Sequence, residues 1–212
     1  KIFIETQKID PNKLYIFKNE DCNKIKDWDT RISRPFLHYL VELLEDPEVI
    51  ELAIEEFKLD INKKDSKKLS LLDKLLNLNY KTIPHPYIMN EKRQLINLDP
   101  QYKKYLSILN KLNAKVSEFI WKDPIKFGRA CYFDMTNIIP IIIKNNPKII
   151  NKTFGEQEFT ALFMLNYNPD LLEFLLKNGA NINAKTTSFD GGSTSLEIII
   201  QSKKGQSIPE IE

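Results

Sequence analysis

Few side chains in this sequence have the chemistry of a catalytic group. Cysteine occurs only at Cys22 and Cys131, and histidine only at His38 and His85. A Cys-His mechanism could use Cys131 as the nucleophile, His85 as the base and Asp134 as the group that orients the base. A reactive thiol needs an accessible and electropositive setting. This hypothesis therefore depends on where the fold places Cys131.

Motifs for metal ions and phosphates are missing. The chain contains no HExxH sequence, no Cys-x-x-Cys pair and no histidine cluster, so the usual zinc motifs do not occur. Its six glycines match neither GxGxxG nor GxxxxGK, which are sequences that bind phosphate groups. His38 has no second ligand beside it in the sequence. We therefore predict no metal site, no cofactor and no enzymatic activity.

Charged residues are unevenly distributed, although the whole chain carries a net charge of only +2. Residues 1–62 carry a net charge of −5, residues 63–126 carry +8 and residues 127–212 carry −1. The acidic excess includes a run that we interpret as a solvated helix face, made of Glu42, Glu45, Asp46, Glu48, Glu51, Glu55, Glu56 and Asp60. The same run could instead mimic nucleic acid or attract a basic partner.

A set of basic residues follows this acidic run, and all of its members are lysines: Lys63, Lys64, Lys67, Lys68, Lys103, Lys104, Lys111 and Lys115. Such a set could bind nucleic acid or the headgroups of acidic lipids. It contains no Arg and no regular interleaving of aromatic residues, which nucleic-acid recognition usually adds. We therefore do not expect nucleic-acid binding, and we favour a partner protein with an acidic surface.

Composition places the chain among ordinary globular proteins. With 212 residues, of which 42% are hydrophobic, it is long enough for one large or two small domains. The most apolar stretch, residues 138–143, is far shorter than the ~18 residues that span a bilayer, so no transmembrane segment is expected. Two cysteines are too few for a disulfide framework and fit a reducing compartment. We predict a cytoplasmic location.

Segment 159–183 has the clearest pattern of local structure. A short apolar helix is expected near residues 161–165. A second helix has a strong start signal, an N-cap followed by Pro and an acid, in Asn168, Pro169 and Asp170. Its apolar face would be formed by Leu171, Leu172, Leu175 and Leu176. Gly179 would then end the helix in a left-handed conformation.

These features resemble an ankyrin repeat. Residues 160–163, Thr-Ala-Leu-Phe, lie where the family has Thr-Pro-Leu-His, and residues 178–183, Asn-Gly-Ala-Asn-Ile-Asn, match the usual end of a repeat. The resemblance implies an all-α solenoid of helix pairs with short hairpin fingers. It also implies a non-catalytic protein-protein interaction module that acts as a monomer.

The Ile-Asn ending at residues 182–183 recurs at residues 150–151 and 61–62 and indicates further repeats. Asn62 and Asn151 are separated by 89 positions, whereas two repeats of the family length would take about 66. The excess of roughly 23 residues matches a proposed inserted loop at residues 79–100, in which two prolines prevent a continuous helix. We interpret residues 101–120 as the displaced second helix of that repeat.

The pattern predicts a series of repeats between two incomplete ends. First helices are expected near residues 35–40, 69–75 and 127–133, and a second helix over residues 136–151. A helix start is also expected at Asp46-Pro47 and at Asp123-Pro124. The complete division is a degenerate capping segment at 1–28, repeats at about 29–62, 63–120 (with the loop at 79–100), 121–151 and 152–183, and a partial repeat at 184–212.

The resemblance also assigns roles to the two side chains with possible chemistry. His38 matches the family's His, which hydrogen-bonds within and between turns. Cys131 falls at a small apolar position of a first helix, so a structural role is favoured over a nucleophile. In this frame we expect no catalytic residue.

The resemblance places the partner surface on the concave side, formed by the fingers and first helices. The residues carried over by position are Tyr39, Lys64, Asp65, Lys67, Lys74, Tyr132, Phe154, Glu156, Met164, Phe189 and Asp190. Aromatic residues in the connecting segments, Trp28, Phe154 and Phe189, could be exposed anchors or could fold back onto the next repeat. The inserted loop at 79–100 is a second candidate for partner binding.

Two broader hypotheses remain open. Ankyrin arrays are often fused to catalytic domains, so the chain could instead be the targeting or substrate-recognition portion of a larger enzyme. The abundance of Lys, Asn and Ile suggests an AT-rich genome. This composition leads to the hypothesis of a secreted effector of an intracellular microbe, which would act in the host cytosol.

Overall fold

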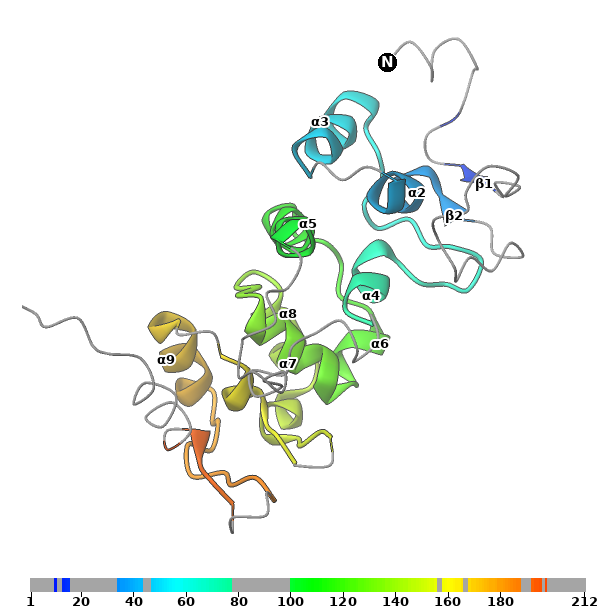
Figure 1. Ribbon diagram of the computed structural model, residues 1–212. Helices are drawn as coiled ribbons and strands as arrows, with labels where there is room; N and C mark the ends of the chain where they lie inside the picture. Colours follow the sequence, from blue (N-terminus) through cyan, green and yellow to red (C-terminus); the bar gives the residue numbers. More distant parts are fainter. Residues whose placement is uncertain are drawn as a thin grey trace, which may run out of the picture. The chain divides into compact units, whose positions relative to one another are not determined.

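The structure is a computed structural model that describes residues 10, 13–15, 34–43, 47–77, 100–155, 158–165, 168–187, 192–195 and 197 (Figure 1). Most of the expected capping segment at 1–28, the inserted loop at 79–100 apart from Pro100, and the end of the partial repeat lie outside these residues. The described part of the chain is mostly helical, and no helix in it is long and apolar enough to cross a membrane.

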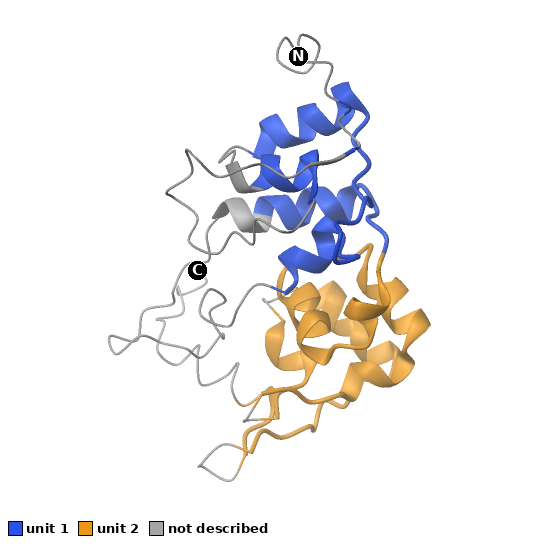
Figure 2. Cartoon of the chain, turned by 90° about the vertical axis from the view of Figure 1, so that its right-hand side faces the viewer, with its two compact units in different colours: residues 1–83, 97–115 blue, residues 84–96, 116–212 orange. Residues whose placement is uncertain are grey.

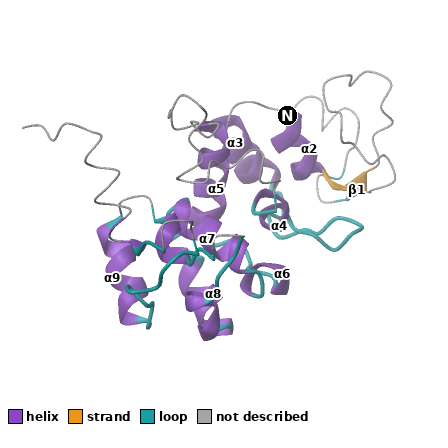
Figure 3. Cartoon of the chain, turned by 60° about the horizontal axis from the view of Figure 1, so that its bottom comes forward, coloured by secondary structure: helices purple, strands orange, loops and turns teal. Residues whose placement is uncertain are grey.

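The chain forms two compact units, which are coloured separately in Figure 2. Unit 1 comprises residues 1–83 and 97–115, and unit 2 comprises residues 84–96 and 116–212. Strands occur, among the described residues, only in unit 1 as β1 (Leu14–Tyr15) and β2 (Arg34–Pro35), which pair antiparallel. Figure 3 shows that helices and loops account for the other described residues.

Unit 1 buries the apolar faces of its helices, which are α2 (Phe36–Leu43), α3 (Pro47–Phe57), α4 (Leu71–Leu75) and α5 (Pro100–Lys111). Helix α2 packs against α3, and α5 packs against both α3 and α4. Side chains with almost no exposure include Leu37, Ile50, Leu72, Leu76, Leu106 and Leu109. Burial of each such side chain stabilises the fold by about 1.5–3 kcal/mol. The apolar residues recur at helical spacing because this places them together on the buried face of each helix.

Unit 2 is built around α7 (Pro124–Tyr132), which packs against α6 (Glu118–Trp121), α8 (Ile139–Asn145) and two 3₁₀ helices. The 3₁₀ helices are η1 (Pro147–Asn151) and η2 (Ala161–Met164), and the last helix is α9 (Pro169–Lys177). Its core side chains include Ile120, Phe127, Cys131, Met135, Ile138, Ile139, Ile142 and Leu175. These side chains are apolar, and the buried residues of unit 2 also include polar and charged ones, among them Arg129 and Thr160.

The predicted helix starts are confirmed. Helix α9 begins at Pro169, and the Asn168 side chain accepts a hydrogen bond from the Leu171 backbone N–H at 3.0 Å. Helix α7 begins after Asp123, which caps it in a similar way, and α3 begins at Pro47. These starts were predictable because an N-cap oxygen satisfies an exposed N–H within the same short segment.

Four helices end in one common way, with a residue at positive φ followed by a buried apolar residue. In α9 the Gly179 N–H donates to the Leu176 carbonyl, and the Ala180 N–H donates to the Leu175 carbonyl, which is the Schellman arrangement. The predicted left-handed stop at Gly179 is confirmed, with φ at +89°. The residues in the corresponding place of α3, α5 and α7 are Lys58, Asn113 and Asp134, none of them glycine.

Two helix predictions are wrong in extent. A single helix over residues 101–120 was expected, but α5 ends at Lys111 because Asn113 turns left-handed, and α6 begins only at Glu118. A single helix over residues 136–151 was also expected, but Asn146 leaves the helical region before Pro147. Proline disfavours a helical conformation in the residue before it, so the chain continues as the separate helix η1.

Candidate functional site: the hairpins between helices

Three connections between helical segments form hairpins with one hydrogen-bond frame. In each hairpin a backbone N–H on the outgoing arm donates to a carbonyl on the returning arm. The pairs are Asp65 to Leu69 at 2.9 Å, Phe154 to Phe159 at 2.9 Å and Thr186 to Ser193 at 3.1 Å. In each hairpin an Asn lies three residues before the outgoing residue, and a Ser or Thr comes directly after the returning residue. The Asn and the hydroxyl residue are Asn62 and Ser70 in the first hairpin, Asn151 and Thr160 in the second, and Asn183 and Thr194 in the third.

The residue just before each returning residue has a left-handed backbone. Its φ is +62° at Lys68, +53° at Glu158 and +84° at Gly192. Glycine is required at 192, because a Cβ there would lie 2.2 Å from the Thr186 carbonyl oxygen. At the other two hairpins a charged residue occupies this conformation, which costs an L-residue roughly 1–2 kcal/mol.

Asp65 organises the first hairpin from the inside. Its side chain is 1% exposed, and its Oδ1 accepts hydrogen bonds from the N–H groups of Lys67 and Leu69, both at 2.9 Å. Its Oδ2 lies 3.1 Å from Lys74 Nζ and makes an ion pair rather than a hydrogen bond. The Lys68 N–H donates to the Asp65 carbonyl, which closes a turn with the left-handed residue at its end. A buried carboxylate therefore determines the shape of this loop.

Buried polar and aromatic side chains surround this ion pair in unit 1. His38 is 1% exposed and Tyr39 is 2% exposed, and the Arg34 guanidinium lies 5.9 Å from the centre of the Tyr39 ring. Burial is the main cause that lowers the pKa of His38 to about 3; Lys74 and Arg34 lower it further, and Asp65 opposes the shift. His38 is therefore neutral at physiological pH.

The family resemblance predicts hydrogen bonds from His38, and the described residues do not bear this prediction out by the geometry of the ring nitrogens. Neither ring nitrogen has a hydrogen-bond partner among the described residues. The Lys63 backbone lies close enough to favour the protonated form of the ring without reaching hydrogen-bond geometry. His38 contributes to this interior as a buried neutral ring.

The second hairpin is organised by an aromatic side chain instead of a carboxylate. Phe154 is half-buried, and its ring lies against Gly128 of α7, where an added Cβ would be 2.7 Å from the Phe154 Cζ atom. The same Cβ would be 3.3 Å from Met164 Cγ. Phe154 is therefore not a fully exposed anchor, and it folds back onto the first helix of the preceding expected repeat (121–151) rather than onto the next repeat.

Side-chain amides tie separate segments together within each unit. In unit 1 Asn62 Oδ1 accepts from the Lys115 N–H at 2.7 Å, across 53 positions of the chain. In unit 2 Asn151 Oδ1 accepts from the Asn181 N–H at 2.8 Å, across 30 positions. Asn151 Nδ2 also donates to the Gly179 carbonyl at 2.8 Å. Both acceptors belong to the Ile-Asn endings identified in the sequence.

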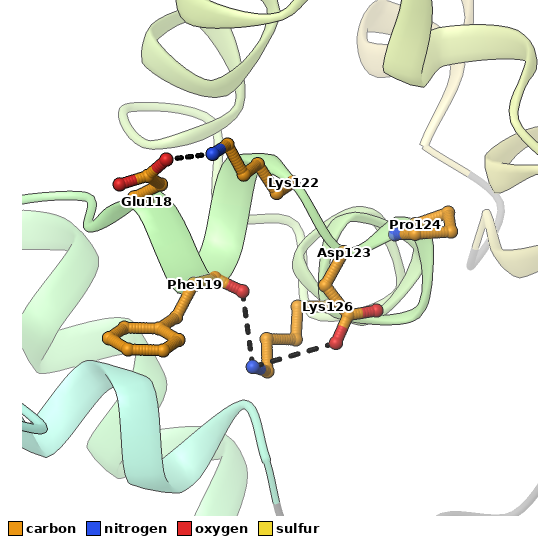
Figure 4. A pocket seen from close by; sticks show the side chains of 6 residues that line it. All are labelled: Glu118, Phe119, Lys122, Asp123, Pro124 and Lys126. Atoms are coloured by element: carbon orange, nitrogen blue, oxygen red, sulfur yellow. Dashed lines mark hydrogen bonds and ion pairs between the residues drawn. The ribbon is translucent and has the colours of Figure 1, made fainter.

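The connection between α5 and α7 contains the short helix α6 instead of a hairpin. It exposes 52% of Phe119 beside a hollow of about 510 Å³ (Figure 4). The Lys126 ammonium donates to the Phe119 carbonyl at 3.1 Å and lies 3.5 Å from the Asp123 carboxylate. The hollow is lined by Glu118, Phe119, Lys122, Asp123, Pro124 and Lys126.

The sequence missed the exposure of Phe119, because an apolar stripe at spacings of three and four residues runs from Tyr102 to Phe119 along the expected helix over residues 101–120. The stripe ends in the structure where α5 ends, so Phe119 no longer lies on the buried face. An Asn at the helix stop was the one available signal, since Asn tolerates the left-handed region better than most residues.

The residues predicted for partner binding fall into four groups. Lys64 and Lys67 are exposed on the first hairpin, and Asp65 and Lys74 form the ion pair beneath it. Tyr39 and Met164 are buried, so they offer no area to a partner. Phe154 and Tyr132 are half-buried, and burial raises the pKa of the Tyr132 hydroxyl. Three more lie outside the described residues: Glu156, Phe189 and Asp190.

Cys131 lies in the core of unit 2 with 0% of its area exposed. Burial raises the pKa of its thiol, and the nearby Asp134 raises it further, so the thiolate is strongly disfavoured. The proposed base His85 lies outside the described residues. An inaccessible thiol without thiolate character does not act as a nucleophile. The described residues also contain no group of three His, Cys, Asp or Glu that could hold a metal ion.

Comparisons with known proteins identify no family. No family model matches this chain, and no curated protein matches it. A similar solved structure contains the Bd0816 predatory endopeptidase from Bdellovibrio bacteriovorus in complex with immunity protein Bd3460. The alignment covers 80% of this chain and 92% of the matched chain, with 19% identity and a TM-score of 0.37. Similarity of this size transfers neither a fold nor a function.

Proposed function

We propose that this chain is an ankyrin-like solenoid of helix pairs and a non-catalytic module that binds another protein through the hairpins between those pairs. The observation that carries the proposal is the common hairpin frame. Three hairpins repeat one hydrogen bond, one left-handed position and one Asn at a fixed distance before them. Recurrence of a structural unit along a chain is the defining property of repeat proteins.

The hydrogen bonds to the side-chain oxygens of Asn62 and Asn151 support both the recurrence of the hairpin frame and the proposed inserted loop. The bond from Lys115 to Asn62 and the bond from Asn181 to Asn151 join corresponding positions, since each donor follows a helix stop by two residues. They span 53 and 30 positions, a difference of 23. The proposed insertion at residues 79–100 accounts for nearly all of that difference. Its own role in partner binding remains a prediction.

A binding role fits what the connections expose. The first two hairpins share a backbone frame but expose different side chains. The first exposes lysines, and in the second Glu158 occupies the position that Lys68 has in the first. Helix α6 exposes the aromatic ring of Phe119 in the connection between them. Variable side chains on a constant backbone are typical of a surface that selects a partner.

The alternative, a recognition portion of a larger enzyme, uses the same surface in a different setting. The burial of Cys131 argues against catalysis by the one cysteine of the described residues. In either setting this chain would bind and the chemistry would take place elsewhere. The proposal therefore concerns a binding surface and leaves the identity of the partner protein open.

Photo-crosslinking tests the proposal. A benzoylphenylalanine would replace Lys64, Phe119, Glu158 or Thr187 in turn, all exposed in connections between helices. Matched controls at the exposed helix positions Lys144 and Lys177 would report random proximity. We expect crosslinks to one discrete protein from the connection sites, which an excess of unlabelled chain abolishes. Equal crosslinking from the control sites would contradict the proposal.

A further inference from the structure

We propose that the first hairpin, residues 63–69, is a preformed docking site for an acidic segment of a partner protein. This inference rests on the proposed function and specifies the chemistry of one of its contact sites. It draws on three observations: the charge of the tip, the way that the tip is held, and the backbone conformation of one of its lysines.

The tip of the hairpin carries a concentrated positive charge. Lys63, Lys64, Lys67 and Lys68 are all exposed. The single acid in this stretch, Asp65, is turned inward to Lys74, so its charge is already compensated beneath the loop. The charged side chains exposed by residues 63–69 are therefore all lysines. A surface of this kind attracts a segment of opposite charge and increases its rate of association.

The tip is held in one shape before any partner binds. The Asp65 carboxylate accepts two backbone hydrogen bonds from the loop that carries the lysines, and its own N–H and carbonyl bond across the hairpin. These bonds reduce the conformational freedom that a partner would otherwise have to restrict. A preorganised site binds more tightly than a flexible one with the same charges.

Lys68 occupies a backbone conformation that favours glycine. Its φ of +62° corresponds to the position that is Gly192 in the third hairpin. Retaining Lys there costs stability, and strain of this kind concentrates at functional sites. This position is occupied by a lysine in the first hairpin and by Glu158 in the second, so the same backbone conformation carries opposite charges at the two tips.

An acidic protein segment fits this tip better than nucleic acid or a lipid surface. The stretch contains neither Arg, which forms bidentate contacts with phosphates, nor an aromatic side chain on which a base could stack. A lipid surface would be expected to use a broader basic face with an apolar residue for insertion. A compact tip of lysines suits carboxylates, which pair with single ammonium groups.

Fluorescence anisotropy can test the inference with a labelled oligoglutamate peptide. Two parallel probes separate the other sources of negative charge: an oligothymidylate and vesicles that contain phosphatidylserine. We expect the full chain to bind the peptide most tightly, with an affinity that falls as salt is added. Tighter binding of the oligonucleotide or the vesicles, or no binding of the peptide, would overturn the inference.

Charge reversal locates the binding site. The variant K64E/K67E/K68E should weaken peptide binding by roughly tenfold or more. The matched control, K144E/K148E/K152E, changes the net charge equally at exposed positions of unit 2. It should change the affinity by less than about twofold, since exposed distant charges are screened. Equal losses in both variants would show nonspecific attraction and overturn the inference.

Asp65→Asn tests whether preorganisation matters. This substitution leaves every lysine in place and removes one negative charge, so simple attraction predicts tighter binding of the peptide. A preformed tip predicts the opposite, a loss of roughly threefold, because the neutral amide holds the loop less firmly. Circular dichroism would verify that the variant is folded; if it is not, charge reversal at the exposed lysines decides alone.

The two proposals fail in distinguishable ways. If crosslinking finds a discrete partner at Phe119 and Glu158 while charge reversal at the hairpin has no effect, the acidic-segment inference is wrong and the binding function stands. If no connection site crosslinks specifically while the hairpin still selects the acidic peptide, the proposal that a partner binds through several connections is wrong and the acidic-segment inference stands.

Discussion

The hairpins at residues 65–69 and 154–159 share a backbone plan and differ in how they are held. In the first, a carboxylate at the outgoing position pairs with Lys74, the fourth residue after Ser70. In the second, the outgoing position is Phe154, and Met164 lies the same distance after Thr160. Phe154 and Met164 both lie against Gly128. One structural position is therefore occupied by an ion pair in unit 1 and by an apolar pair in unit 2.

The difference shows that the hairpin frame does not depend on one kind of interior. An ion pair beneath the first tip is compatible with polar neighbours such as His38, whereas an apolar pair beneath the second needs a glycine to make room for an aromatic ring. The tips differ as well, since lysines face solvent in the first and Glu158 in the second. Each of the following experiments perturbs one side of this comparison.

The largest loss of stability is expected from removing the buried carboxylate of Asp65. Asp65→Ala would leave Lys74, whose side chain is 21% exposed, without its ion-pair partner and would remove two hydrogen bonds to the loop. We expect a loss of about 3 kcal/mol in the free energy of unfolding. Phe154→Ala, at a half-buried position, should cost about 1–2 kcal/mol.

Urea denaturation followed by circular dichroism would measure both losses. The double variant D65A/K74M supplies the control, because replacing both members of the ion pair removes the ammonium group together with the carboxylate and should recover much of the loss. If Asp65→Ala proves no more costly than Phe154→Ala, the carboxylate does not organise the first hairpin as described.

A smaller loss of stability is expected when the pH is lowered, and it should affect the first hairpin, in whose unit His38 is buried. The unfolded chain binds a proton at His38 as the pH falls below about 6.5, whereas the folded chain resists it until about 3. Stability is therefore intact above pH 6.5 and falls as the pH decreases through this window. The slope is at most about 1.4 kcal/mol per pH unit, so a change from pH 6.5 to 5 should cost about 2 kcal/mol.

Hydrogen exchange at single amides provides the comparison. After correction for intrinsic rates, the Leu69 N–H should lose protection as the pH falls, while the Phe159 N–H in the second hairpin should lose less. His38→Leu should remove the difference, because no group at that position then titrates. An unchanged difference in the variant would assign the pH dependence to other groups.

The smallest effect is expected at the left-handed positions. Lys68→Gly and Glu158→Gly should each stabilise the chain by about 1 kcal/mol, because glycine adopts positive φ without a steric penalty. Scanning calorimetry should show an increase of a few degrees in the midpoint. Lys68→Gly should also weaken binding of the acidic peptide. A decrease in the midpoint for both variants would show that these residues are not strained.

Local signals were well predicted because they act over a few residues. The starts of α7 and α9 follow from Asp123 and Asn168, whose side chains bond to a backbone group of the next turn. Gly179 marks the end of α9 because only glycine adopts a left-handed backbone without cost. The mostly helical character of the described residues follows from these signals and from the spacing of apolar residues.

Helix ends without glycine were not predicted. Asn113 ends α5 in a left-handed conformation that a buried Ala114 helps to stabilise, and the same pattern recurs at Lys58 and Asp134. Such a stop depends on a pocket for the following apolar residue rather than on the intrinsic preference of the residue that turns. Exposure of Phe119 was missed for this reason.

Taken alone, the sequence determined where α3, α7 and α9 begin, the stop at Gly179 and the concentration of lysines in residues 63–69, because these are properties of neighbouring residues. Only the tertiary structure decided that Asp65 points inward and that Phe154 folds back. Asp65 is buried because the fold brings Lys74 beneath the hairpin, and Phe154 packs because Gly128 of another helix leaves space for its ring. Side-chain direction depends on partners distant in the chain, which local preferences do not specify.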